Sequence, residues 1–232
     1  MLPPSNPDAL QAGADILPSI GTDESGKGDF FGPLVCAGVY VDAASAEVLR
    51  GSGVRDSKRL SDPRCRELAE VIKGTCRGQY IILGIGPARY NDLYERFRRE
   101  GKTLNTLLAW AHARVLENLL GRVECAHAIT DQFADPRFVQ SKLQERGKKI
   151  HLLQMPRAET HIAVAAASIL ARARFLEQLE RLSAQFGLPL PKGASQAVIQ
   201  AGQAFVKRFG KAALRQVAKL HFRTTVQVLA SA

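Results

Sequence analysis

Four acidic residues stand where predicted secondary-structure elements end, and together they could do chemistry. Asp23 and Glu24 close a short predicted strand. Asp131 ends a later strand, and Glu159 stands just before a long predicted helix. Loops at the ends of elements are where active sites are usually built. If the four carboxylates converge, their mutual repulsion keeps them from all ionising unless cations are bound.

Carboxylate oxygens alone suit Mg²⁺ or Mn²⁺ rather than zinc. Two such ions about 4 Å apart are the usual means of phosphodiester hydrolysis. Adjacent strand residues point to opposite faces, so Asp23 and Glu24 reach one ion only if the strand ends or bends there. The following turn, 25–28, supplies a bend. The alternative, that each acid is a solvated cap of its strand, stays open on spacing alone.

The turn Gly26-Lys27-Gly28 allows two interpretations. It could be a plain hairpin turn, or its glycines could let the backbone approach a nucleic acid closely. The run from Gly21 to Lys27 also fits the start of a phosphate-binding P-loop. That motif requires Ser or Thr next, where this chain has Gly28, so we exclude a P-loop nucleotide triphosphatase.

The hydrophobic pattern predicts an α/β fold: a mixed sheet with an antiparallel three-strand start, flanked by helices, and a helical basic C-terminal region. The predicted strands are 19–24, 33–41, 80–85, 125–130 and 150–155. The predicted helices are 104–120, 136–146 and 160–186, with further helices after Ser195 and Lys211. Residues 1–18 are expected to be a flexible leader, and 19–232 one catalytic domain.

The charge balance favours a polyanionic partner. The formal net charge is +10, and no Asp or Glu follows Glu180, which predicts a surface that tracks phosphates. The alternative is that some of these cations pair with acids from earlier in the chain. The four cysteines form no Cys-x-x-Cys pair, and neither a signal peptide nor a membrane-length apolar stretch is visible. We therefore expect a cytoplasmic monomer without a membrane partner.

The run Gly21–Val35, GTDESGKGDFFGPLV, resembles the opening signature of ribonuclease HIII, in the type 2 branch of the ribonuclease H family, whose HII members usually carry Gly-Arg-Gly. The resemblance continues in order through the following motifs and covers nearly all of 20–224: Asp56-Ser57-Lys58-Arg59-Leu60, Leu104–Ala113, Thr130-Asp131-Gln132-Phe133, Ala158–Leu170, Leu190–Ser195 and Lys219–Phe222.

This resemblance implies a ribonuclease H fold and an endonuclease that cuts the RNA strand of RNA–DNA hybrids with two Mg²⁺ or Mn²⁺ ions, leaving a 5′-phosphate and a 3′-hydroxyl. It assigns Asp23, Glu24, Asp131 and Glu159 as catalytic metal ligands, with Asp23 bridging the ions. It implies that the substrate is bound by Ser25, Gly26, Lys27, Gly28, Ser57, Lys58, Ser168 and Arg172. Ser57 and Lys58 would contact phosphate or order the site. Ser168 and Arg172 could share a phosphate. The alternative for these two is that Ser168 packs its helix and Arg172 is solvated. His161 is expected to be structural, and Trp110 and His112 to be core residues.

Two departures from the family pattern bear on function. About twenty residues precede the signature, so we expect the usual N-terminal domain, similar to TATA-binding protein, to be absent. Ribonuclease HII reads the RNA–DNA junction with a tyrosine after its fourth carboxylate. Here the corresponding stretch is Pro191–Ser195 and all four tyrosines precede Asp131. Alternative functions are HII-like cleavage at single ribonucleotides embedded in DNA and a hybrid-binding module without activity.

Overall fold

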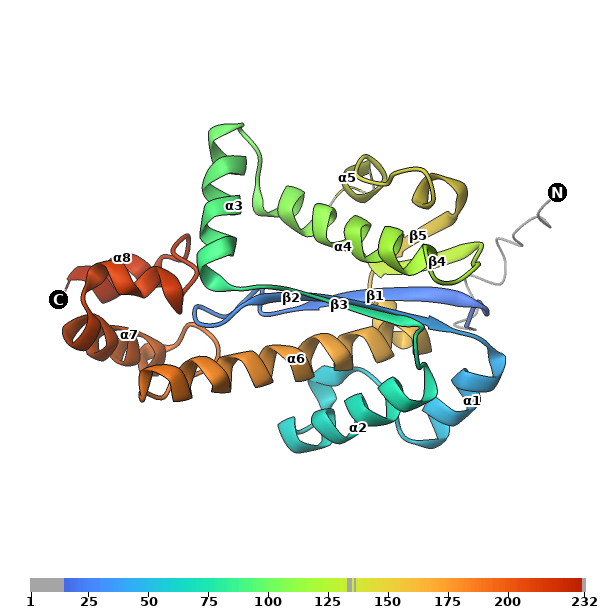
Figure 1. The fold of residues 1–232 in the computed structure, drawn as a ribbon, viewed down its shortest axis with the longest axis horizontal. Coiled ribbons are helices and arrows are strands. Elements are labelled where there is room, and N and C mark those ends of the chain that lie inside the picture. Colours follow the sequence, from blue (N-terminus) through green and yellow to red (C-terminus); the bar gives the residue numbers. More distant parts are fainter. Residues whose placement is uncertain (1–14, 133–134, 136, 231–232) are drawn as a thin grey trace. The chain divides into compact units, whose positions relative to one another are not determined.

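The computed structural model describes residues 15–132, 135 and 137–230, so most of the expected leader lies outside the described residues (Figure 1). The chain divides into two compact units. The first comprises residues 1–24, 36–83 and 108–173, and the second 25–35, 84–107 and 174–232.

The first unit carries most of a five-stranded sheet in the order β3-β2-β1-β4-β5. Its strands are β1 (Ser19–Ser25), β2 (Leu34–Val41), β3 (Tyr80–Ile85), β4 (His127–Asp131) and β5 (His151–Met155). Strand β4 pairs in parallel with both β1 and β5. The end of β2 lies beside the start of β3, because the Tyr40 amide donates to the Gln79 carbonyl at 2.9 Å. The predicted mixed sheet is therefore confirmed.

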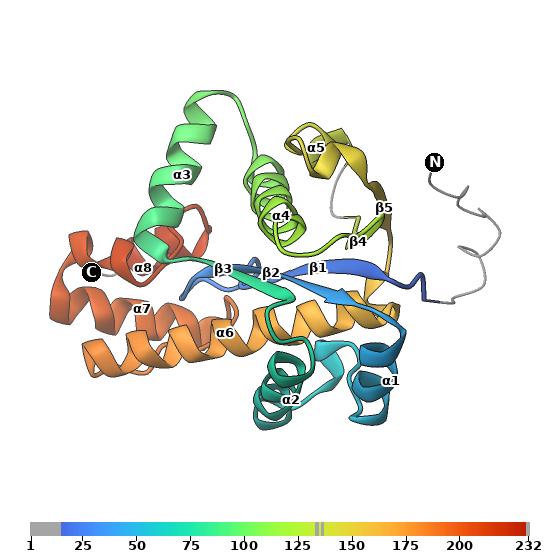
Figure 2. The ribbon, with the colours of Figure 1, turned by 45° about the vertical axis from the view of Figure 1, so that its right-hand side comes forward.

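Helices cover both faces of this sheet in the first unit. Figures 1 and 2 show α4 and α5 on one face, and α1, α2 and α6 on the other. The bounds are α1 (Ala43–Gly51), η2 (Ser57–Arg59), α2 (Asp62–Thr75), α4 (Leu104–Leu120), α5 (Arg137–Gln140), η3 (Gly147–Lys149), η4 (Ala158–Thr160) and α6 (Ile162–Phe186), the last of which continues into the second unit. Side chains buried between sheet and helices, such as Ile20, Leu116 and Ala128, form the core.

The helix predicted over 136–146 is wrong for most of its length, because α5 ends at Gln140; position 136 lies outside the described residues. The cause is Glu117, a buried acid of α4 whose Oε1 accepts from the amides of Gln144 at 2.6 Å and Gly147 at 2.8 Å. These amides point at a side chain rather than at helical carbonyls. The chain therefore turns here before β5 begins.

The second unit is helical, with α3 (Pro87–Arg99), α7 (Gln196–Phe209), η5 (Lys211–Gln216), α8 (Thr224–Ala230) and the end of α6. Ser195 directly precedes α7, as predicted, whereas the segment after Lys211 is a short 3₁₀ helix followed by α8. The core of this unit contains the fully buried rings of Phe30, Phe31, Tyr90 and Phe205. None of the helices within the described residues is both long and apolar enough to cross a membrane.

Gly21 marks the closest approach of α6 to β1, and we predict that Gly21→Ala disrupts the first unit. A Cβ at Gly21 would lie 2.1 Å from the Ala163 carbonyl carbon and 2.2 Å from the Val164 amide nitrogen. Because both are helix backbone atoms, the clash is expected to cost roughly 3 kcal/mol or more of folding free energy. Gly74→Ala in α2 is the control: no atom lies within 4 Å, so it should add about 0.5–1 kcal/mol. Denaturant unfolding measures both, and a Gly21→Ala protein as stable as wild type would contradict this packing.

Candidate active site

The register of the parallel strands places the predicted acids along one edge of the sheet. Thr22 of β1 is paired with Thr130 of β4, so Asp23 and Asp131 are the next residues on neighbouring strands that run in the same direction. Glu159 lies in η4, four residues after the end of β5, and η4 packs against β4. The carboxyl ends of parallel strands are where α/β proteins bind ligands.

Asp23 occupies an unfavourable position for a carboxylate. Burial, and then the charge of Glu24, raise the pKa of Asp23 to about 7, although the Glu24 amide and Ser168 donate hydrogen bonds to it. A carboxylate with such a pKa gains free energy from a nearby cation, because the cation favours its ionised form.

Glu24 is held by a histidine that the sequence suggested was only a core residue. His112 is fully buried, as predicted, and its Nε2 lies 3.1 Å from Glu24 Oε2. Its Nδ1 lies 2.8 Å from the Thr22 hydroxyl and 3.2 Å from the Thr130 hydroxyl. Although burial lowers the pKa of His112, its contacts with Cys36 and Glu24 raise that pKa well above the usual value, so the protonated ring donates from Nε2–H to Glu24 and from Nδ1–H to a threonine hydroxyl. His112 therefore fixes the orientation of one predicted ligand and ties β1 to β4.

The predicted substrate residues Ser57 and Lys58 lie on η2, close to Glu159. The Asp56 side chain accepts from the Lys58 amide at 2.9 Å and so caps this short helix. The Lys58 ammonium lies 4.0 Å from Glu159 Oε1, and the Lys58 side chain is 77% exposed. Ser57 is buried and shares a 2.6 Å hydrogen bond with Ser168. Ser57 therefore orders the η2 loop, whereas a phosphate contact of the exposed Lys58 stays a prediction.

Ser168 and Arg172 are likewise engaged within the protein. Ser168 is buried and contacts both Ser57 and Asp23. Arg172 donates to the Ser57 carbonyl and forms a 2.6 Å ion pair with Asp62. These two residues of α6 therefore fasten the η2 loop beside Asp23, the packing role that the sequence left open for Ser168. His161, also predicted to be structural, is buried with Nε2 3.2 Å from Met155 Sδ.

The segment Ser25–Val35, which carries the Gly26-Lys27-Gly28 turn, belongs to the second unit and is firmly held there. Gly26 has φ of 88°, and a Cβ on it would lie 2.1 Å from the Pro33 carbonyl oxygen, so only glycine fits. Gly28, in contrast, is exposed with no atom near its missing Cβ. The fully buried Lys219 donates to the carbonyls of Phe31, Gly32 and Pro33, the shortest bond being 2.6 Å to Gly32. This structural role of Lys219 was not predictable from its place in a basic segment.

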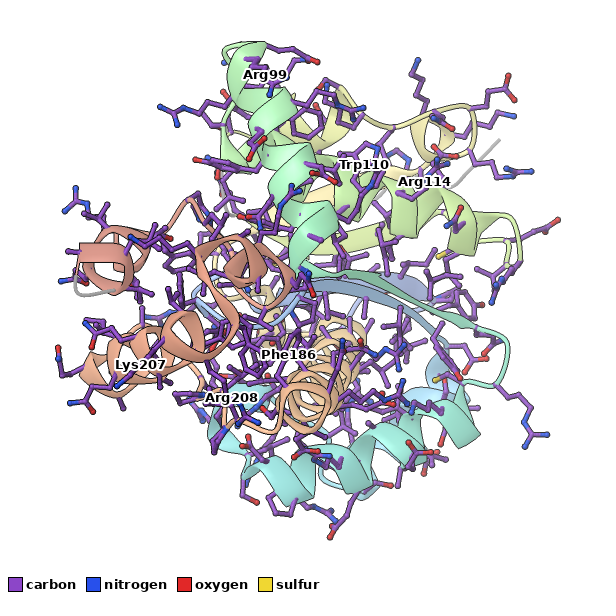
Figure 3. The ribbon with its side chains drawn as sticks, turned by 60° about the vertical axis from the view of Figure 1, so that its left-hand side comes forward. Arg99, Trp110, Arg114, Phe186, Lys207 and Arg208 are labelled. Atoms are coloured by element: carbon purple, nitrogen blue, oxygen red, sulfur yellow. The ribbon has the colours of Figure 1, made fainter. Side chains whose placement is uncertain are left out.

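The basic C-terminal region contains both cations that are paired or buried within the protein and cations that are exposed on its surface. Arg215 pairs with Asp92 at 2.7 Å and Lys219 is buried, so some basic residues do serve the fold. Lys207, Arg208 and Lys211 are exposed. Figure 3 labels Lys207 and Arg208 near the end of α7. Some cations of this region are therefore engaged within the protein, the alternative that the sequence left open, and phosphate tracking by the others stays a prediction.

The described residues contain no group of three or more His, Cys, Asp or Glu side chains arranged to hold a metal ion. The predicted ligands nevertheless suit a hard divalent cation. They present oxygen only, they stand at one sheet edge, and burial together with the charge of Glu24 raises the pKa of Asp23, which a bound cation would lower. The set fits Mg²⁺ or Mn²⁺ by donor type and by electrostatics.

Comparison with known proteins agrees with this geometry. The family model for ribonuclease HII matches residues 20–225. The ribonuclease HIII of Protochlamydia amoebophila (strain UWE25) is 47% identical over 215 residues, covering 93% of this chain and 69% of that protein. The ribonuclease HIII of Chlamydia pneumoniae is 46% identical, covering 90% and 70%. The structure of Bst-RNase HIII in complex with Mn²⁺ superposes with a TM-score of 0.85 at 36% identity, covering 97% of this chain and 73% of that one.

The fold and the site thus define an α/β nuclease with a ribonuclease H-like sheet. The chain belongs to the ribonuclease HII family, and the relatives described above are ribonucleases HIII. The resemblance read from the sequence is confirmed, and so is the prediction of a ribonuclease H endonuclease that acts on RNA–DNA hybrids.

We predict that His112→Phe destabilises the protein by about 2–4 kcal/mol, because it keeps the ring volume but leaves two buried hydroxyls and the Glu24 carboxylate without their shared partner. His127→Phe is the matched control: His127 is only partly buried and stacks on His151, so the same substitution should change stability by less than about 0.5 kcal/mol. Urea unfolding measures both. Equal effects of the two substitutions would show that the His112 contacts are not stabilising.

Proposed function

We propose that this enzyme hydrolyses the RNA strand of RNA–DNA hybrids with two divalent ions, Mg²⁺ or Mn²⁺, held by Asp23, Glu24, Asp131 and Glu159, and leaves a 5′-phosphate and a 3′-hydroxyl. The observation that carries this proposal is the in-register parallel pairing that sets Asp23 beside Asp131, combined with the raised pKa of Asp23. The structure of Bst-RNase HIII in complex with Mn²⁺ supports dependence on a divalent metal.

When bound, such ions lower the pKa of the attacking water and stabilise the leaving 3′-oxygen. The protein's own residues prepare the site. His112 holds Glu24, and Ser168 donates to Asp23 while fastening the Ser57 loop. Asp23 would hold a divalent ion, because burial and the charge of Glu24 raise its pKa and a bound cation would favour its ionised form.

The substrate is proposed to be read by the segment Ser25–Gly28. Gly28 has open space around it, so a sugar can approach the backbone there, and 2′-hydroxyls in the minor groove distinguish RNA from DNA. Lys58, exposed beside Glu159, is proposed to contact a phosphate. We further propose a cytoplasmic monomer. The four cysteines are free thiols, which suits a reducing compartment.

A cleavage assay tests this function against its two rivals. A uniform RNA–DNA hybrid and a duplex with one embedded ribonucleotide are each incubated with Mg²⁺, Mn²⁺ or excess chelator. The proposal expects cleavage of the hybrid with either ion and none with chelator. Binding without cleavage under every condition would instead indicate a non-catalytic hybrid-binding module.

We predict that Asp131→Asn lowers the cleavage rate by at least about a hundredfold, since it removes the charge of a proposed metal ligand at constant volume. Glu117→Gln is the control, because Glu117 is a buried acid that only caps the amides of Gln144 and Gly147. It should cost about 1 kcal/mol of stability and leave the rate unchanged. An Asp131→Asn enzyme that cleaves as fast as wild type would remove Asp131 from the metal site.

We also predict a preference for runs of ribonucleotides over a single embedded one. Among the aromatic residues that could replace the junction tyrosine, Phe205 is fully buried, and the Phe186 ring packs on it with centroids 5.0 Å apart. A missing stacking contact of about 1–3 kcal/mol corresponds to roughly a tenfold to hundredfold loss of junction preference. The measurement is the ratio of cleavage rates for a hybrid with four or more ribonucleotides and a duplex with one. Equal rates in Mg²⁺ would favour HII-like specificity.

A further inference from the structure

A cavity of about 690 Å³ opens beside Glu159 in the first unit, and arginines line much of it. Its lining includes Arg50, Arg55, Arg59, Arg157 and Glu159. These arginines are neither among the substrate residues that the resemblance implies nor among the proposed metal ligands. Four guanidinium groups around one cavity repel one another unless anions are present.

The acids of the cavity neutralise only part of this charge. Asp15 forms an ion pair with Arg50 and also accepts from the Ile162 amide at 2.8 Å. Asp56 caps η2 through the Lys58 amide. The Glu159 carboxylate faces the Lys58 ammonium at 4.0 Å.

The guanidinium groups of Arg55, Arg59 and Arg157 form no ion pair with any residue in the described parts of the chain (15–132, 135 and 137–230). All three side chains belong to exposed residues. The cavity therefore holds three guanidinium groups that remain able to bind an anion.

The backbone at Arg157 is a second, independent sign of a binding role. Arg157 has φ of 57° and ψ of 37°, and it is the one non-glycine residue with positive φ among the described residues. This left-handed conformation is unfavourable for a residue with a Cβ and suits glycine. Residues in such backbone conformations cluster at active sites and ligand-binding sites. Here the left-handed conformation places a guanidinium at the cavity, two residues before Glu159.

We propose that Arg55, Arg59 and Arg157 form a binding site for a backbone phosphodiester of the hybrid, next to the one that is cleaved. A guanidinium matches a phosphate with two parallel N–H donors, which gives both affinity and orientation. With one phosphate held here and Lys58 beside Glu159, the strand is fixed on the side of the site formed by η2 and η4. The inference rests on the proposed function, because it assigns a contact of that same substrate.

The first experiment measures hybrid affinity in chelator, so that no metal or cleavage enters the readout. Arg157→Gly removes the guanidinium and also relieves the left-handed strain. Its unfolding temperature should equal or exceed that of wild type, while its hybrid affinity falls roughly tenfold. The slope of log affinity against log salt concentration should decrease by about 0.9, the value for one phosphate contact.

Arg114→Gln is the matched control for lost charge, since Arg114 is an exposed residue of α4, which covers the opposite face of the sheet from α1 and α2 (Figures 1 and 3). It should change neither the affinity nor the slope. Arg55→Gln and Arg59→Gln should each weaken binding. Combining either with Arg157→Gly should lose less than the sum of the two effects, since the three share one phosphate. An Arg157→Gly protein that is folded and binds the hybrid like Arg114→Gln would overturn the site.

The second experiment identifies the strand. Single neutral methylphosphonate linkages are moved along the RNA strand in one series and along the DNA strand in another. In wild type one linkage should weaken binding, and in Arg157→Gly that same linkage should have no effect. The linkage should appear in the RNA series, next to the cleaved phosphodiester, and its appearance in the DNA series or its absence from both series would contradict the inference. A wild-type enzyme that fails to cleave hybrids would instead reject the proposed function, and the two failures are distinguishable.

Discussion

The structure of the first unit depends on two adjacent, partly buried carboxylates, Asp23 and Glu24, near the end of a core strand. Burial, and then the charge of Glu24, raise the pKa of Asp23 to about 7. His112 of α4 contacts Glu24, and Ser168 of α6 donates to Asp23, so a helix supplies a polar contact to each of the two acids.

The same constraint explains the surroundings of the site. His112 also contacts Thr22 and Thr130, so a single ring locks the register that sets Asp23 beside Asp131. Ser168 also holds Ser57, so the residue that donates to Asp23 fixes the loop carrying Lys58. What remains uncompensated is negative charge at the sheet edge and positive charge in the neighbouring arginine cavity. A metal-bound nucleic acid would satisfy both.

Much of this architecture was predictable, and the failures have physical reasons. Strand 80–85 and helix 104–120 have the predicted bounds because each shows a clear hydrophobic pattern between breakers. Helices α1, α2 and α3 were not predicted, although Asp42 caps α1 and Ser61 caps α2. The partners of His112 were not predictable, since Thr22 lies 90 residues away and such pairing follows only from the folded sheet. The left-handed Arg157 likewise carries no signal in local sequence.

We expect the acids at this sheet edge to bind divalent cations. Thermal unfolding with and without Mn²⁺ at pH 8 tests this expectation most directly. In chelator, Asp23→Asn should unfold at a higher temperature than wild type, because it removes the repulsion with Glu24. With millimolar Mn²⁺ wild type should gain stability, since an ion that binds only the folded state stabilises it, and Asp23→Asn should gain far less. A wild-type protein that Mn²⁺ does not stabilise, or an Asp23→Asn variant that gains as much as wild type, would contradict the account.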